Sequence, residues 1–154
     1  MNVVVGEAAP DFTLRAHDGT PWSLVAQRGR PVVLYFYPKD GTPGCTTQAC
    51  DLRDRWAEFE QTGAVIVGIS ADNAASHLSF RAEHGLPQTL LVDEGGAVTR
   101  QYGAWGPKVK DGVTTEGVVR SCVVVSASGD LVAVASPVSP EQHAQFALDA
   151  LTSA

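Results

Sequence analysis

The sequence predicts an α/β fold in which a mixed central β-sheet is flanked by helices. Three short apolar runs, at residues 31–37, 64–70 and 89–93, alternate with segments of helical periodicity. Two further strand-like runs, at 118–125 and 131–136, are separated only by the turn sequence SASGD. Strands joined by helices pair in parallel and strands joined by tight turns pair antiparallel, so both kinds of pairing are expected in one sheet.

The chain begins with a predicted β-hairpin. Residues 11–14 and 21–24 are typical of short strands, and Asp18 and Gly19 between them form a turn signal. The run at 31–37, PVVLYFY, is apolar throughout and rich in β-branched and aromatic residues. Such a run predicts a strand that is buried on both faces of the sheet.

Helices are expected between and after the buried strands. The first should span 43–61 and end at Gly63, the second should span 73–84 and end at Gly85, and a last helix should span about 140–151. Two smaller features are a short helix at 96–102 and a Gly-rich loop with a small hairpin at 103–117. This order fits a thioredoxin-like sheet, and residues 1–154 are predicted to form one domain.

Composition limits the classes of function. The 154 residues are 44% hydrophobic and 18% charged, which is typical of a globular chain. A formal net charge of −6 argues against nucleic acid or an acidic membrane surface as the main partner. No run of about 18 apolar residues predicts a membrane span, and no secretory signal is evident. Three cysteines without such a signal indicate a reducing compartment, so we expect a cytoplasmic protein.

The stretch YPKDGTPGCTTQAC, residues 37–50, has the features of a reactive helix start. Thr42 is a favourable N-cap and Pro43 a favourable first helical residue, which places Cys45 in the first turn. Backbone N–H groups in that turn lack helical partners, and together with the helix dipole they favour thiolate over thiol. We expect Gly44 to keep the approach to the sulfur open.

The spacing of Cys45 and Cys50 does not suit a disulfide in an intact helix. Residues five apart are separated by about 7.5 Å of rise and roughly 140° of rotation. Their Cα atoms would lie about 8 to 9 Å apart, whereas a disulfide requires less than about 7 Å. A bond between these two cysteines would therefore need the first turns to open. From the residues alone, two unreactive structural thiols remain an alternative.

The same stretch resembles the peroxiredoxins. Pro38, Thr42 and Cys45 form the PxxxTxxC pattern of that family, and YFYPKDGTPGCTTQACDLRD resembles the bacterioferritin comigratory protein, or peroxiredoxin Q, branch. The segments VGISADNAASHLSF, GLPQTLLVDEGG, YGAW and GVVRS match in register. The resemblance covers roughly residues 3–150.

The resemblance implies a role for five residues. Cys45 would attack a hydroperoxide and become a sulfenic acid, and Cys50 would resolve it as an intramolecular disulfide. Thioredoxin or a similar dithiol protein would then reduce that disulfide. Thr42 would hydrogen-bond the peroxide, Pro38 would wall the pocket, and Arg120 would stabilise the thiolate and the transition state. The resemblance implies no metal, haem or flavin, and it implies a monomer.

Two positions depart from the family pattern. Gln48 stands where glutamate is more frequent, so the amide would fill the carboxylate's role around the arginine or leave it weaker. Cys122 stands where a bulky apolar residue is usual. We expect Cys122 to be a small core residue, with a second redox-active or resolving thiol as the alternative.

The remaining candidates carry weaker signals. Trp105 packs either near the active site or as an anchor of its loop. The four histidines lack zinc-ligand spacing with the cysteines and are predicted at the surface: His17, His77, His84 and His143. Two other classes of function stay open, a thiol–disulfide oxidoreductase, which the lack of a CxxC motif disfavours, and a binding or chaperone-like protein with inert thiols.

Overall fold

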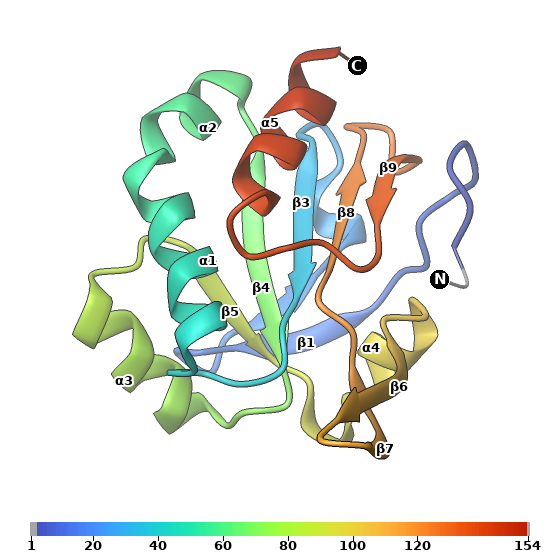
Figure 1. Ribbon diagram of the computed structural model, residues 1–154. Coiled ribbons are helices and arrows are strands. Elements are labelled where there is room, and N and C mark those ends of the chain that lie inside the picture. The colour runs from blue at the N-terminus through green and yellow to red at the C-terminus, as the bar shows by residue number, and fades with distance from the viewer. Residues whose placement is uncertain (1–2, 154) are drawn as a thin grey trace.

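The computed structural model describes residues 3–153 and is built on a seven-stranded sheet (Figure 1). The strand order is β2-β1-β5-β4-β3-β8-β9, in which β3, β4 and β5 are parallel and the other pairings are antiparallel. The predicted mixed sheet with an N-terminal hairpin is confirmed. The strands are β1 Thr13–Ala16, β2 Pro21–Ser23, β3 Val32–Phe36, β4 Val65–Ser70, β5 Thr89–Val92, β8 Ser121–Val125 and β9 Leu131–Ala135, with β6 Trp105–Lys110 and β7 Val113–Val118 forming a separate hairpin.

Most of the helices cover one face of this sheet (Figure 1). Buried side chains from α1, α2, α3 and α5 share one core with that face, whereas α4 contributes to the opposite core. In residues 3–153 no helix combines the length and the apolar character that crossing a membrane requires. The helices are α1 Pro43–Asp54, α2 Trp56–Thr62, α3 Ala74–His84, α4 Ala97–Gln101 and α5 His143–Ser153, with 3₁₀ turns at Val25–Gln27 and Glu94–Gly96.

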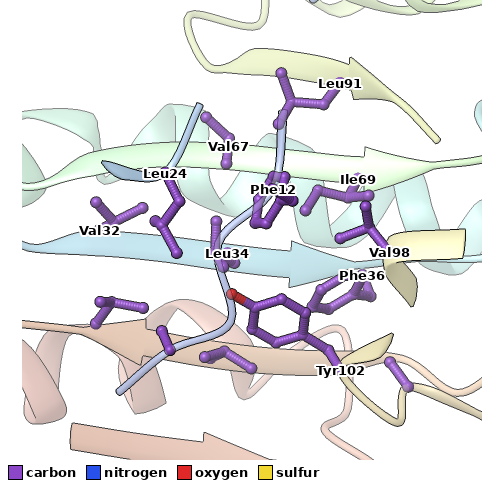
Figure 2. Close-up of a cluster of buried hydrophobic side chains, with 14 of the residues drawn as sticks. Phe12, Leu24, Val32, Leu34, Phe36, Val67, Ile69, Leu91, Val98 and Tyr102 are labelled. Carbon is purple, nitrogen blue, oxygen red and sulfur yellow. The ribbon is translucent and has the colours of Figure 1, made fainter. Parts of the chain in front are cut away.

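The central strand β3 explains why its sequence is apolar throughout. Successive side chains of a strand point to opposite faces, and both faces of β3 are covered. Val33 and Tyr35 enter the core beneath the helices, whereas Leu34 and Phe36 enter the second core. Figure 2 shows that second core, in which the strand residues meet side chains from outside the sheet, including Phe12, Leu24, Val98 and Tyr102.

The predicted helix over 43–61 is two helices. At Arg55 the backbone leaves helical geometry, with φ −106° and ψ 17°, so α1 ends at Asp54 and α2 begins at Trp56. Leu52 and Phe59, one on each helix, are both fully buried. No proline or glycine marks the break, so no local signal in the chain predicts it. The predicted stop at Gly63 is confirmed, and its φ of 76° is the left-handed geometry that glycine favours.

The predicted strand over 118–125 is also divided. Val118 ends β7, and β8 begins at Ser121. The reason is topological, because β7 pairs with β6 in the small hairpin and β8 pairs with β3 and β9 in the main sheet. Arg120 therefore lies in the connection just before β8. The alternation of side chains along a strand does not set the direction of its side chain.

Candidate active site

Helix α1 begins as the sequence predicts, with Thr42 as the N-cap and Pro43 as the first residue. The Thr42 backbone is extended, with φ −71° and ψ 154°, and its carbonyl accepts the N–H of Thr46 at 2.8 Å. The Thr42 hydroxyl makes no capping hydrogen bond and instead donates to the carbonyl of Lys39 at 3.1 Å. Cys45 follows in the first turn and is 2% exposed.

Arg120 lies against the sulfur of Cys45. Both terminal nitrogens of its guanidinium, Nη1 and Nη2, are 3.5 Å from Sγ, and Nη1 also donates to Oε1 of Gln48 at 2.5 Å. The guanidinium therefore places a fixed positive charge and two N–H groups beside the sulfur. The Gln48 amide thus contacts the arginine at the position where the family pattern more often has glutamate. Unlike a glutamate, it adds no negative charge beside the sulfur.

Gly44 makes room for two neighbouring side chains. A Cβ at this position would lie 3.1 Å from Nη2 of Arg120 and 3.5 Å from Cγ of Pro140. The missing side chain therefore accommodates the arginine and the segment before α5. The backbone of Arg120 is itself held, because its carbonyl accepts the N–H of Val138 at 2.9 Å.

The predicted site residues fall into three positions. Cys45 and Arg120 are in direct contact, although 75 residues separate them. Pro38 and Thr42 are partly buried in the loop between β3 and α1, and neither is hydrogen-bonded to Sγ within the described residues. Cys50 lies about one and a half turns further along the same helix.

Cys50 is a partly exposed free thiol on an unbroken part of α1. It lines an open cleft together with Thr47, Asp51, Asp54 and Glu141. Helix geometry keeps its Cα about 8 to 9 Å from that of Cys45. The intact helix therefore holds the two cysteines apart.

Cys122 is a fully buried free thiol on β8. It pairs with Tyr35 of β3 and packs in the same core as Cys45. Burial raises the pKa of Cys122 far above its ordinary value. This is the environment expected for a small core residue.

A hydrogen-bonded group that we call the loop network ties the β3–α1 loop to α3. The Asp40 carboxylate lies 2.7 Å from Nδ1 of His77, which is fully buried, and Nε2 of His77 donates to the carbonyl of Leu91 at 2.9 Å. Burial alone would raise the pKa of Asp40, but hydrogen bonds from His77 and Tyr37 outweigh it and the pKa is lowered. The members are Tyr37, Asp40, Ser70, Asp72, Ser76 and His77.

The ligand-type atoms of Asp40, Asp72 and His77 lie within 4.8 Å of one another. They are already engaged: Asp72 accepts the backbone N–H of Asp40 at 2.8 Å and the hydroxyl of Ser70 at 2.7 Å. The arrangement is therefore a satisfied hydrogen-bond network. The sequence contained all of its members inside the stretches that resemble the family, but no spacing rule linked them.

A second set of buried polar side chains, the core polar group, lies beneath α1 and consists of Tyr35, Gln48, Gln88 and His143. Nε2 of Gln88 donates to the hydroxyl of Tyr35 at 3.1 Å and to the carbonyl of Ala49 at 3.2 Å. The His143 ring lies 5.2 Å from the Tyr35 ring. Four buried atoms have no hydrogen-bond partner among the described residues, namely Nε2 of Gln48, Oε1 of Gln88 and both ring nitrogens of His143.

The surface prediction was wrong for His77 and His143, which are both fully buried. Burial, together with the charge of Arg120, lowers the pKa of His143 to about 3, so this imidazole is neutral at physiological pH. His17 and His84 are partly exposed. The histidine ring is amphipathic and occurs both in cores and at surfaces. The positions of the four histidines in the sequence therefore did not show which of them are buried.

Trp105 serves as an anchor of the β6–β7 hairpin. It pairs with Val118 and packs partly buried against the core opposite the helices. The guanidinium carbon of Arg100 lies 4.0 Å from the centre of its ring. Of the two alternatives that the sequence left open, the packing favours the anchor.

The fold and the site together define a thiol-dependent peroxidase, and comparison with known proteins agrees. Residues 5–134 match the AhpC/TSA family. The chain is 38% identical to peroxiredoxin Bcp of Bacillus subtilis over 151 residues, which cover 98% of this chain and 96% of that protein. It is 54% identical to chloroplastic peroxiredoxin Q of Arabidopsis thaliana over 101 residues, which cover 66% of this chain and 47% of that longer protein.

A solved structure extends the match to three dimensions. The bacterioferritin comigratory protein of Xanthomonas campestris, studied for its alkyl peroxide reduction activity, aligns with a TM-score of 0.89 at 34% identity. The alignment covers 97% of this chain and 98% of that one. The chain therefore belongs to the AhpC/TSA family, and within it to the Bcp/peroxiredoxin Q branch of the peroxiredoxins. The expected thioredoxin-like fold is confirmed.

Proposed function

We propose that the protein reduces hydrogen peroxide and organic hydroperoxides through a sulfenic acid on Cys45 that Cys50 resolves. One observation carries this proposal: the Cys45 sulfur lies in the first turn of α1, 3.5 Å from both terminal nitrogens of Arg120. The unpaired N–H groups of that turn and the guanidinium are donors that favour a thiolate. They are also suited to stabilise the negative charge that develops when a peroxide bond breaks.

In the first step the Cys45 thiolate attacks the terminal oxygen of the hydroperoxide. An S–O bond forms, the O–O bond breaks, and the alkoxide or hydroxide takes up a proton and leaves as alcohol or water. The sulfur loses two electrons and the peroxide gains them. Thr42 would turn its hydroxyl from the Lys39 carbonyl to the peroxide, Pro38 would wall the pocket, and Arg120 would hold both sulfur and oxygen.

In the second step the Cys50 thiolate attacks the oxidised sulfur, an S–S bond forms, the S–O bond breaks, and the hydroxide takes up a proton from solvent and leaves as water. Because an intact α1 separates the two residues, the first turns of α1 must unwind. A contact of α1 that this motion would break is the hydrogen bond from Gln88 to the Ala49 carbonyl. A dithiol protein such as thioredoxin would then reduce the disulfide and regenerate both thiols.

Every residue of this cycle comes from one chain, so we propose that a monomer is active. A reducing compartment such as the cytoplasm would supply the dithiol reductant. The proposal assigns no metal and no organic cofactor to the cycle, because the electrons pass between peroxide, thiols and the reductant.

The test uses Cys45→Ser, Cys50→Ser and Cys122→Ser in a thioredoxin-coupled peroxidase assay. Cys45→Ser should abolish peroxide consumption, and Cys50→Ser should block turnover while Cys45 is still oxidised by one equivalent of peroxide. Cys122→Ser is the matched control and should turn over normally. Full activity in Cys45→Ser would refute the mechanism. Peptide mapping after oxidation should find a Cys45–Cys50 bond, and a Cys45–Cys122 bond would move the resolving role.

A further inference from the structure

His77, near the start of α3, is fully buried, and both of its ring nitrogens face hydrogen-bond acceptors. Nε2 lies 2.9 Å from the carbonyl oxygen of Leu91 on β5, and Nδ1 lies 2.7 Å from Oδ2 of Asp40 in the loop between β3 and α1. A carbonyl oxygen can only accept, so Nε2 carries a proton. The state of Nδ1 depends on whether the carboxylate of Asp40 is ionised.

The contacts of Asp40 indicate an ionised carboxylate that accepts on both oxygens. Oδ1 accepts the hydroxyl of Tyr37 at 2.6 Å, and Oδ2 accepts the hydroxyl of Ser76 at 2.8 Å. Burial alone would raise the pKa of Asp40, yet these bonds together with the one from His77 lower it. An ionised carboxylate has no proton to give, so Nδ1 of His77 carries a proton of its own.

An imidazole that donates from both nitrogens is positively charged, and its surroundings favour that charge. Asp72 supplies a second carboxylate, because the ligand-type atoms of Asp40, Asp72 and His77 all lie within 4.8 Å of one another. The neighbouring imidazole of His17 does not compete with it, since burial, followed by the charge of Arg81, lowers the pKa of His17. The centre of the loop network is therefore a buried ion pair.

This ion pair holds the loop that leads to Cys45. The Asp40 side chain is 4% exposed, and the backbone N–H of the same residue donates to Oδ2 of Asp72 at 2.8 Å. Two residues later Thr42 begins α1, and its hydroxyl bonds back to the carbonyl of Lys39, which closes a compact turn that contains Asp40. A shift of Asp40 would therefore be passed on to the first turn of α1.

Loss of the positive charge on His77 would leave Asp40 without a counter-ion. His77 is the cationic partner that Asp40 has among residues 3–153. A buried carboxylate without a partner either takes up a proton or turns toward solvent, and both changes alter its contacts. An open recess lined by Asp40, Gly41 and Ser76 gives the carboxylate a direct way to water.

We propose that His77 is a positioning residue for peroxide reduction, whose doubly protonated ring holds Asp40 and, through it, the loop that carries Thr42 and Cys45. The inference rests on the proposed function of Cys45 and adds a residue outside its sequence motif. The chemistry at sulfur is unchanged. The effect is on placement, and misplacement of reacting groups by about 1 Å can slow a reaction by as much as about a hundred-fold.

The first test observes the protons of the ring by NMR, on reduced protein with isotope-labelled histidine and at the pH of the oxidation assay. Both ring nitrogens of His77 should carry protons in the wild type. In Asp40→Asn a neutral amide replaces the carboxylate, and His77 should keep a proton on one nitrogen only. A wild-type His77 with a single protonated nitrogen would overturn the inference.

The second test compares two amides at position 77 that each keep one donor. The amide nitrogen of asparagine reaches the place of Nδ1, and that of glutamine reaches the place of Nε2. His77→Asn thus keeps a bond to Asp40, whereas His77→Gln keeps the bond to Leu91. Oxidation of Cys45 by hydrogen peroxide, followed by stopped flow, should be about ten-fold slower in His77→Gln and about three-fold slower in His77→Asn.

Both amides lose the charge and one hydrogen bond, so a merely structural role predicts equal rates. Equal rates in the two variants, or a wild-type rate in His77→Gln, would overturn the inference. Asp40→Asn tests the pair from its other side and should be about as slow as His77→Gln, and a wild-type rate there would also overturn it.

His84→Gln is the matched control, because it removes an imidazole from the partly exposed end of the same helix and should keep the wild-type rate. The proposed function has its own outcome. A wild-type Cys45 that hydrogen peroxide fails to oxidise would refute that function, whereas the NMR measurement judges the ion pair without any reaction at sulfur.

Discussion

The loop network and the core polar group are neighbours that differ in how completely their hydrogen bonds are made. Tyr37 of the first and Tyr35 of the second stack with ring centres 5.5 Å apart. In the loop network both ring nitrogens of His77 and both oxygens of Asp40 have partners. In the core polar group four buried atoms of the described chain have none. A completed network holds one arrangement, whereas each unpartnered buried group costs about 1–3 kcal/mol.

The difference follows the work that each region does in the proposed cycle. The loop network holds the segment that carries Thr42 and leads to Cys45, which must stay in place for attack on the peroxide. The core polar group includes Gln48 on α1, and Gln88 bonds to α1 at Ala49. This is the helix that must open for Cys50. Hydrogen bonding is complete in the loop that positions the sulfur and incomplete beneath the helix that must unwind.

The largest expected effect comes from breaking the loop network with Asp40→Ala. The change removes the acceptor for His77, Tyr37 and Ser76 in a site where the Asp40 side chain is 4% exposed. We expect a loss of about 3–5 kcal/mol in the free energy of unfolding, measured by urea denaturation of the reduced protein. Ser76→Ala, which removes a single hydrogen bond, should lose about 1 kcal/mol. Equal losses in the two variants would contradict the importance given to Asp40.

An intermediate effect is expected from His143→Phe in the core polar group. In the folded state the pKa of His143 is about 3, and in the unfolded chain it is about 6.5. Below about pH 6.5 the unfolded state binds a proton that the folded state refuses, so stability falls by up to about 1.4 kcal/mol per pH unit. The phenylalanine removes this loss, and its advantage over the wild type should be about 2 kcal/mol larger at pH 5 than at pH 8.

Urea denaturation of both proteins across this pH range gives the comparison for His143→Phe. His84→Phe, which removes an imidazole at a partly exposed position, is the matched control. A pH profile of His143→Phe parallel to that of the wild type would show that the imidazole is not held neutral in the fold.

The smallest effect is expected from Gln88→Leu, which removes the hydrogen bond to the Ala49 carbonyl. Helix α1 should open more easily, by about 1 kcal/mol, because a typical net hydrogen bond contributes that much. Amide hydrogen exchange in residues 43–54 should therefore become about five-fold faster, while exchange in β3 and β4 stays slow. Unchanged exchange in α1 would mean that Gln88 does not restrain the helix.

How much the sequence predicted depended on whether the signal was local. The buried strands, the N-cap at Thr42 and the stop at Gly63 each follow from residues close in the chain, and they were predicted correctly. The break at Arg55 has no local marker and was missed. Leu52 and Phe59, on either side of the break, lie in one buried core that exists only in the assembled fold.

The site showed the same limit. Cys45, Thr42 and Pro38 stand in one recognisable motif, and Arg120 was found because the resemblance extended to GVVRS. His143 could not be recognised, because its burial and its neighbours Tyr35 and Arg120 come together only on folding.

The burial of Cys122 makes its reaction with a thiol reagent a measure of how far the fold has opened. A thiol reagent added to the reduced protein meets Cys50 at the surface, while Cys45 is nearly enclosed and Cys122 is completely enclosed. Unwinding of α1 alone would make the sulfurs of Cys45 and Cys50 accessible to a bulky reagent, and that of Cys122 would become accessible only when the sheet itself comes apart. Counting labelled cysteines by mass therefore distinguishes a molecule that has moved within its catalytic cycle from one that has lost its fold.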